Sequence, residues 1–147
     1  MKSKINARAN VIIHSSIAEV WDALTNPEKI KQYFFGTNTV TDWKPGSPIK
    51  FQGVWEGKSY EDKGTIIDVQ KNKLIKYDYW SSLSGIEDKP ENYVTITYEL
   101  TGNDNYVNLG ILQENIRDEE MKKHSEENWK IVLSGLKKLA ERNMVNA

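Results

Sequence analysis

The chain contains no cysteine among its 147 residues. This absence excludes disulfides, thiolate metal ligands and cysteine nucleophiles. Histidine is nearly as scarce, with only His14 and His124, which lie far apart in the sequence. Glu120 and Glu127 stand at helical spacing from His124, but a zinc motif would need a second histidine within reach. We therefore predict no metal site.

Long apolar runs and an excess of one charge are also missing. No window approaches the ~20 apolar residues that a membrane-spanning helix needs, and no signal-peptide run follows the basic N-terminus. We expect no membrane span and a cytoplasmic protein. With 20 Lys+Arg against 21 Asp+Glu, the formal net charge is −1, which argues against a nucleic-acid partner.

Motifs for nucleotide binding and for covalent catalysis do not occur. The sequence has no G-x-x-x-x-G-K or G-x-G-x-x-G loop and no G-x-S-x-G elbow. The adjacent carboxylates Glu61-Asp62 and Glu87-Asp88 fall in expected turns, where solvation explains them. We predict no catalytic residues and no cofactor, so that an enzyme is the less favoured reading.

Aromatic residues are abundant, with five Trp, seven Tyr and three Phe. They supply enough apolar area to offset the chain entropy, and a chain of this length suits one domain over residues 1–147.

The first third of the chain predicts a strand followed by two helices. Apolar residues alternate over 5–13, which indicates a half-buried strand. Ser16 and Glu19 have the spacing of a capping box at the start of a helix over 16–25. Asn26-Pro27 then suits the start of a second helix over 27–34.

Six strands and one long helix are expected after these helices. The strands are predicted at 39–43, 49–55, 65–70, 74–80, 94–100 and 106–115, and the helix at 119–143. The short connections permit only antiparallel neighbours. The prediction is an α+β fold of order β-α-α-β6-α, in which a curved antiparallel sheet wraps around the C-terminal helix, the only cover long enough.

A cavity between the sheet and this helix would be lined by inward-facing aromatic side chains, because small-molecule pockets are apolar with a few polar groups. Gly135, within the helix, costs ~1 kcal/mol relative to Ala, and a cavity or a close approach to the sheet would compensate. The candidate lining residues are Trp43, Phe51, Trp55, Tyr77, Tyr79, Tyr98, Asn128, Trp129, Val132 and Gly135. The alternative is that they simply form the core. The loop 81–91 and the segment 34–36 are candidate lips, or else plain surface loops.

Three stretches resemble a known family. They are residues 20–28 (VWDALTNPE), residues 64–69 (GTIIDV) leading into 74–80 (LIKYDYW), and residues 124–129 (HSEENW) with the leucines that follow. The sequence resembles the START-like (helix-grip, SRPBCC) superfamily, and within it the family of activator of heat-shock protein 90 ATPase homologues. Asn128 stands where that family usually has Gly. The resemblance covers essentially the whole chain and implies the helix-grip fold.

This superfamily includes lipid and sterol carriers, polyketide cyclases, hormone receptors and co-chaperone domains, so the resemblance leaves function open. Our first hypothesis is a protein that binds a hydrophobic or aromatic, lipid-like small molecule in the cavity. The second is a co-chaperone-like module with a chaperone partner. The third is a cyclase- or hydrolase-like enzyme on the same scaffold.

Overall fold

The fold is described here from a computed structural model, which covers residues 4–82 and 85–145, without the side chains of Trp55 and residues 143–145. In chain order the elements are β1 (Ile5–Ile13), α1 (Ile17–Thr25), α2 (Pro27–Tyr33), β2 (Asn38–Val40), β3 (Pro48–Trp55), β4 (Lys58–Gln70), β5 (Leu74–Tyr79), the 3-10 turn η1 (Pro90–Asn92), β6 (Val94–Gly102), β7 (Val107–Ile116) and α3 (Glu119–Val145). The predicted order and the helix-grip fold are confirmed.

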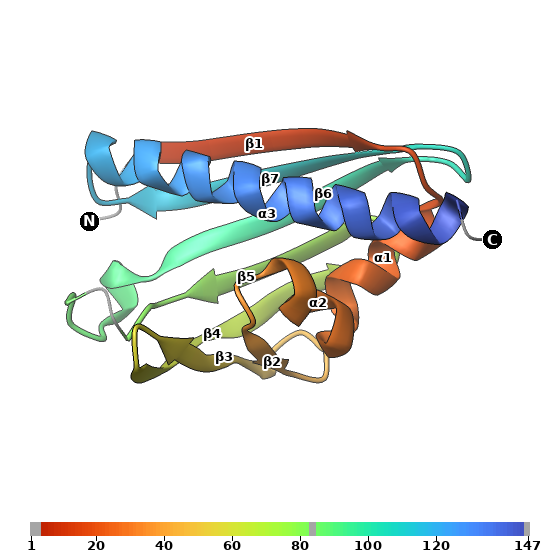
Figure 1. The fold of residues 1–147 in the computed structure, drawn as a ribbon. Coiled ribbons are helices and arrows are strands. Elements are labelled where there is room, and N and C mark those ends of the chain that lie inside the picture. The colour runs from red at the N-terminus through yellow and green to blue at the C-terminus, as the bar shows by residue number, and fades with distance from the viewer. Residues whose placement is uncertain (1–3, 83–84, 146–147) are drawn as a thin grey trace.

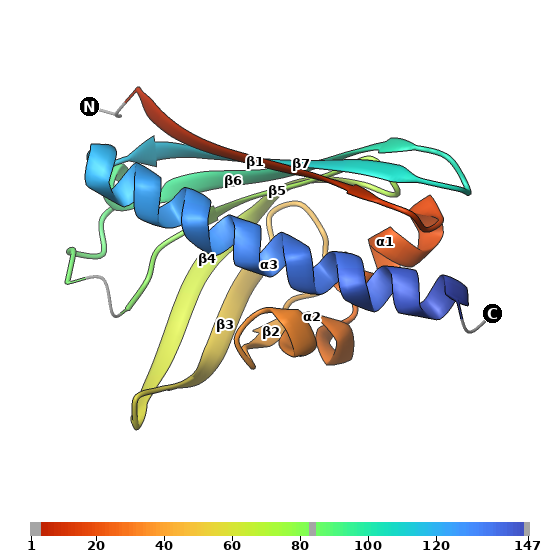
Figure 2. The same ribbon diagram turned by 45° about the horizontal axis from the view of Figure 1, so that its top comes forward.

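All the strands join one seven-stranded antiparallel sheet in the order β1-β7-β6-β5-β4-β3-β2. The helices α1 and α2 carry the chain from β1 at one edge to β2 at the other. The sheet curves around α3, which lies across its concave side with β1 along one flank (Figure 1, Figure 2). Among the described helices, none combines the length and apolar composition needed to cross a bilayer.

The core lies between α3 and the concave face of the sheet. Alternate residues of each strand point to this face, and α3 contributes one stripe at helical spacing. The buried residues of α3 are Trp129, Val132, Leu133, Leu136, Leu139 and Ala140. Met121 has the same spacing but is 41% exposed. The apolar stripe of α3 therefore enters the core about three turns after the helix begins.

Two of the expected strands differ by three residues or more at one end, and the others by no more than two. β2 ends at Val40, because Thr41 and Asp42 accept hydrogen bonds from the backbone two residues on and turn the chain. β4 begins at Lys58 instead of residue 65, because Glu56 and Gly57 both have positive φ and close a two-residue hairpin. The polar stretch 58–64 lacks a clear apolar face, which concealed the strand.

This longer β4 corrects the expectation for one carboxylate pair. Glu61 and Asp62 lie within the strand and not in a turn, so their side chains point to opposite faces. Glu61 is exposed, whereas Asp62 is only 7% exposed and faces the concave side. Solvation therefore accounts for the charge at Glu61, but it does not account for a carboxylate buried at Asp62.

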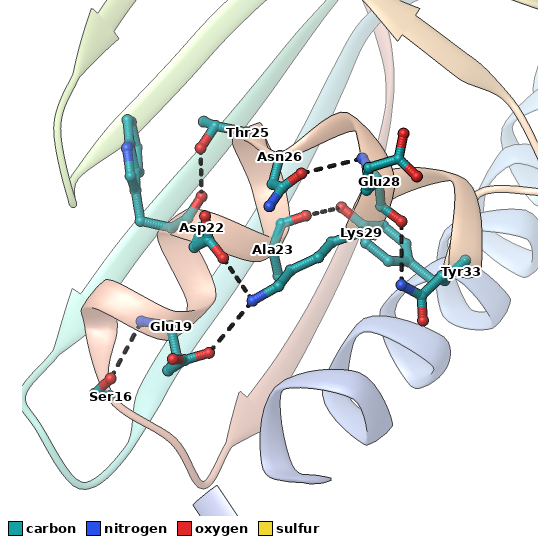
Figure 3. A network of polar contacts seen from close by, with 11 residues as sticks. Ser16, Glu19, Asp22, Ala23, Thr25, Asn26, Glu28, Lys29 and Tyr33 are labelled. Atoms are coloured by element: carbon teal, nitrogen blue, oxygen red, sulfur yellow. Dashed lines mark hydrogen bonds and ion pairs between the residues drawn. The ribbon is translucent and has the colours of Figure 1, made fainter. Parts of the chain in front are cut away.

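A polar network fixes the corner between α1 and α2 (Figure 3). The Ser16 hydroxyl accepts from the backbone N–H of Glu19, as the capping box predicts. Lys29 of α2 pairs with Asp22 of α1 at 2.5 Å, and the Tyr33 hydroxyl donates to the carbonyl of Ala23 at 2.7 Å. These contacts hold α2 in place, and α2 delivers the next residues of the chain to the concave side.

Candidate ligand-binding cavity

Five aromatic side chains form a closed cycle of ring contacts on the concave side. Phe34 stacks on Phe51, with ring centroids 6.4 Å apart. Phe51 contacts Tyr77 at 5.7 Å, and Tyr77 meets Tyr98 edge-on at 5.8 Å. Trp129 closes the cycle, with centroids 5.9 Å from Tyr98 and 6.0 Å from Phe34. The end of α2, three strands and α3 therefore meet in one aromatic cluster.

A cavity of ≈ 460 Å³ opens over part of this cluster. It lies between strands β3 to β6 on one side and α3 on the other, with the segment after α2 at its mouth. Phe35, which is 54% exposed, and the exposed side chains of His124 and Asn128 stand at the opening. The lining residues are Phe34, Phe35, Thr37, Phe51, Tyr60, Asp62, Tyr77, Tyr79, Ile96, His124, Ser125, Asn128, Trp129 and Val132. Its size is in the range of small-molecule sites.

One end of the cavity is polar. The carboxylate of Asp62 accepts hydrogen bonds from the hydroxyl of Tyr79, from the backbone N–H of Ser82 at 2.9 Å and from the Ser82 hydroxyl at 3.3 Å. Beside it, the hydroxyls of Tyr60 and Thr37 lie 2.6 Å apart. Tyr60 fits here because its ring lies over Gly53, where a β-carbon would stand 2.6 Å from the Tyr60 hydroxyl oxygen.

Three tyrosines in and behind the cavity wall, Tyr77, Tyr79 and Tyr98, remain neutral over the physiological range. Burial raises the pKa of Tyr98 to about 12, although its hydrogen bond with Tyr77 works in the opposite direction. Burial, together with the charge of Asp62, raises the pKa of Tyr79 well above its ordinary value, and burial does the same for Tyr77. These hydroxyls can donate or accept hydrogen bonds, but they do not act as bases near neutral pH.

A smaller void of ≈ 20 Å³ lies deeper, on the α1–α2 side of the same cluster. Phe34, Phe51 and Tyr77 line both spaces and separate them. The deeper void is bordered by Tyr98 and by Trp43, a residue of the loop before β3 that has φ +60°. Trp43 and Tyr98 thus lie behind the cavity wall.

A family model described as "Activator of Hsp90 ATPase homolog 1-like protein" matches residues 14–141. The chain belongs to this family. Its members commonly bind ligands or act with Hsp90. No curated protein sequence matches the chain.

Solved structures agree with membership of the Hsp90-activator-like family. The chain is 46% identical to ChR145 from Cytophaga hutchinsonii, with a TM-score of 0.83 and full coverage of both chains. It is 18% identical to the Aha1 dimer from Colwellia psychrerythraea, with a TM-score of 0.73, covering 93% of this chain and 96% of that one. MLL2253 from Mesorhizobium loti is also 18% identical, with a TM-score of 0.76 over 94% and 98% of the two chains. The two more distant matches show the shared fold.

The sequence-predicted residues fall into four groups within this family fold. Those that line the cavity are Phe51, Tyr77, Tyr79, Asn128, Trp129 and Val132. Trp43 and Tyr98 border the deeper void instead. The side chain of Trp55 lies outside the described residues. Gly135 borders neither space, because α3 packs closely against Tyr33 of α2 at this position.

Sequence reasoning missed the polar end of the cavity. The sequence pattern places Asp62 in a solvated turn and Tyr60 outside any predicted strand, because the polar stretch 58–64 has no clear apolar face. The alternation of Tyr60, Asp62 and Gly64 was the available signal, since residues two apart share a face. Phe34 and Phe35 were expected as one lip, and both line the cavity. In the other candidate lip, Ser82 hydrogen-bonds Asp62.

Proposed function

We propose that this protein binds a small, largely apolar molecule in the cavity between the sheet and α3. The observation that carries the proposal is the closed cycle of five aromatic side chains beneath an open cavity of ≈ 460 Å³. Aromatic walls of this kind favour flat or ring-containing ligands, since each ring offers a large apolar face. Hydroxyls and amides at the two ends would orient the ligand.

A thermal-shift screen against fatty acids, sterols, flavonoids and polyketide-like aromatics tests the proposal. A ligand present at about 100 times its Kd adds ~2.7 kcal/mol to the free energy of unfolding, which raises the Tm by several degrees. We expect a saturable rise for at least one of these classes.

A blocking variant ties any such shift to the cavity. Asn128→Trp places a large ring at the mouth, from an exposed position on α3 that lines the cavity. Ser134→Trp is the matched control, because Ser134 is also exposed on α3 but does not line the cavity. The ligand-induced shift should disappear in Asn128→Trp and persist in Ser134→Trp. Equal shifts in both variants would place the ligand elsewhere.

Family membership supports a second candidate, a module that acts on an Hsp90-type chaperone. The Colwellia psychrerythraea relative, named as an Aha1 dimer, has the same fold. The test is the ATPase rate of a purified Hsp90 with increasing amounts of this chain. A saturable rise in rate would support this candidate, and an unchanged rate together with no co-purification would exclude it.

A further inference from the structure

Asp62 is the one charged side chain among the buried residues that the structure describes. It lies on β4 directly opposite Phe51 on β3, so the two side chains share the concave face. It is also the only carboxylate among the described residues that line the cavity. A carboxylate this deeply buried is ordinarily paired with a cation, because burial of an unpaired charge is costly.

No cation from the described part of the chain fills that role. The three donors to Asp62 are neutral groups of Tyr79 and Ser82, and no Lys, Arg or His nitrogen of the described residues lies within 4.0 Å of its carboxylate. The nearest lysine in sequence, Lys63, pairs with Asp88 at 2.6 Å. A carboxylate has about four acceptor positions, and three are used here. One position therefore remains for a ligand.

The surroundings of Asp62 suit a positively charged nitrogen. The rings of Phe51 and Tyr79 lie 5.5 Å apart beside the carboxylate, and Tyr60 stands on the same strand face. Aromatic faces attract ammonium groups, more strongly when water is excluded. A ligand carboxylate or phosphate would instead meet Asp62, and no Lys or Arg occurs among the described lining residues to offset the repulsion.

We propose that the cavity selects ligands that combine an apolar ring system with a protonated amine, and that the ammonium group lies against Asp62 beside the rings of Phe51 and Tyr79. This inference rests on the proposed small-molecule function and names the class of ligand. The apolar body of the ligand would extend from the amine along Phe34 and Trp129 toward the mouth.

The test compares three probes that share one ring and differ in the head group: tryptamine, tryptophol and indolepropionic acid. Titration is followed through the backbone amide NMR signals of the full chain, up to millimolar probe. We expect tryptamine to bind about tenfold or more tightly than tryptophol, because hydrogen bonds to charged groups are the stronger ones, and the acid to bind most weakly. The largest shifts should fall on β3 and β4 near Phe51 and Asp62.

Three variants identify the group responsible. Asp62→Asn keeps the shape and one of the two acceptor oxygens but removes the charge, so the preference for tryptamine over tryptophol should vanish. Glu61→Gln is the matched control, because it removes the same charge from the neighbouring, exposed position and should leave the preference unchanged. Tyr79→Phe frees a further acceptor position on Asp62 and should retain the preference, which keeps the test informative if Asp62→Asn folds poorly.

Two results would overturn this inference, and they differ in what they say about the proposed function. Binding of the probes in the cavity without a preference for the amine, or a preference that survives in Asp62→Asn, contradicts the role of Asp62 alone. A lack of binding by all three probes contradicts amine selection, while a positive shift with larger neutral ligands in the thermal screen would still uphold the cavity.

Discussion

Gly135 of α3 lies so close to Tyr33 of α2 that an added β-carbon would stand 2.9 Å from the Tyr33 β-carbon and 3.5 Å from its α-carbon. The glycine therefore sets the distance between the two helices. Tyr33 is the last residue of α2, and Phe34 follows it into the aromatic cluster. The close approach predicted for Gly135 thus involves a helix and not the sheet, and it positions one wall of the cavity indirectly.

Gly135→Ala should destabilise the protein by about 1 kcal/mol. Alanine gains ~1 kcal/mol in helix propensity, but overpacking typically costs about 1–3 kcal/mol, and the contact here includes the backbone of α2. Ser134→Ala, one residue away and exposed, is the control and should stay within about 0.5 kcal/mol of the wild type. Urea unfolding measures both. If Gly135→Ala is more stable than the wild type, α2 can move away from α3 at little cost, and the predicted overpacking is contradicted. Gly135→Leu should destabilise the protein further, because its larger side chain would meet Tyr33 of α2.

Gly64→Ala should be among the most destabilising substitutions in the sheet. A β-carbon at Gly64 would stand 1.8 Å from the carbonyl oxygen of Asp78 on β5, and backbone cannot yield as a flexible side chain does. We expect a loss of at least about 3 kcal/mol in urea unfolding, or failure to fold. Gly110→Ala on β7 is the matched control, since its nearest neighbour would be the Asn10 side-chain nitrogen at 4.0 Å. Similar losses at both positions would contradict the close approach of β4 to β5.

Two glutamates of α3 should protect the unpaired edge of β1 from pairing with another chain. Glu126 accepts from the backbone N–H of Arg8 at 3.0 Å, and Glu141 accepts from that of His14 at 2.8 Å. Lys137 donates to the carbonyl of Ile12 at 2.8 Å and pairs with Glu141. Exposed edges of this kind invite pairing with another chain. The double variant Glu126→Ala/Glu141→Ala should lose about 1–2 kcal/mol and self-associate more readily.

Light scattering with size-exclusion chromatography measures that association, and Glu127→Ala, which removes an exposed glutamate from the same helix, serves as the control. The contribution of Glu141 to this edge should depend on pH. Burial acts to raise the pKa of Glu141, but the hydrogen bonds from Lys137 and His14 outweigh it and lower the pKa below 4.5. The contribution of Glu141 is therefore present above about pH 4.5 and lost as the pH falls further. If the double variant self-associates no more readily than the wild type at every pH tested, the two glutamates do not protect the edge of β1.

Alkaline pH should weaken the fold through the buried tyrosines. The pKa of Tyr98 rises from 10.0 to about 12 on burial, so the unfolded chain loses the phenol proton first. The stabilisation is fully present below pH 10 and is lost as the pH rises toward about 12. A shift of this size corresponds to roughly 2–3 kcal/mol. Urea unfolding as a function of pH measures it, with Tyr98→Phe expected to flatten the profile. An equally steep decline in that variant would assign the effect to other tyrosines.

The amount that could be read from the sequence differed between elements. The caps at Ser16 and Asn26 and the alternation in β1 are local signals, so the first strand and both short helices were predicted within a residue or two. The first half of β4 was missed, because its outward residues are charged and its inward ones, Tyr60 and Asp62, are polar or amphipathic. A pattern of apolar periodicity cannot detect a strand whose buried face is partly polar.

The order of the elements, and with it the helix-grip fold, follows from local signals, because caps, turns and periodicity act over a few neighbouring residues. Which side chains meet depends instead on how distant elements pack together. Phe34, Phe51, Tyr77, Tyr98 and Trp129 come from five separate elements, and their ring contacts depend on the curvature of the sheet and the path of α3. The burial of Asp62 likewise follows from the pairing of β4 with β3, and that burial makes an otherwise ordinary carboxylate a candidate for ligand selection.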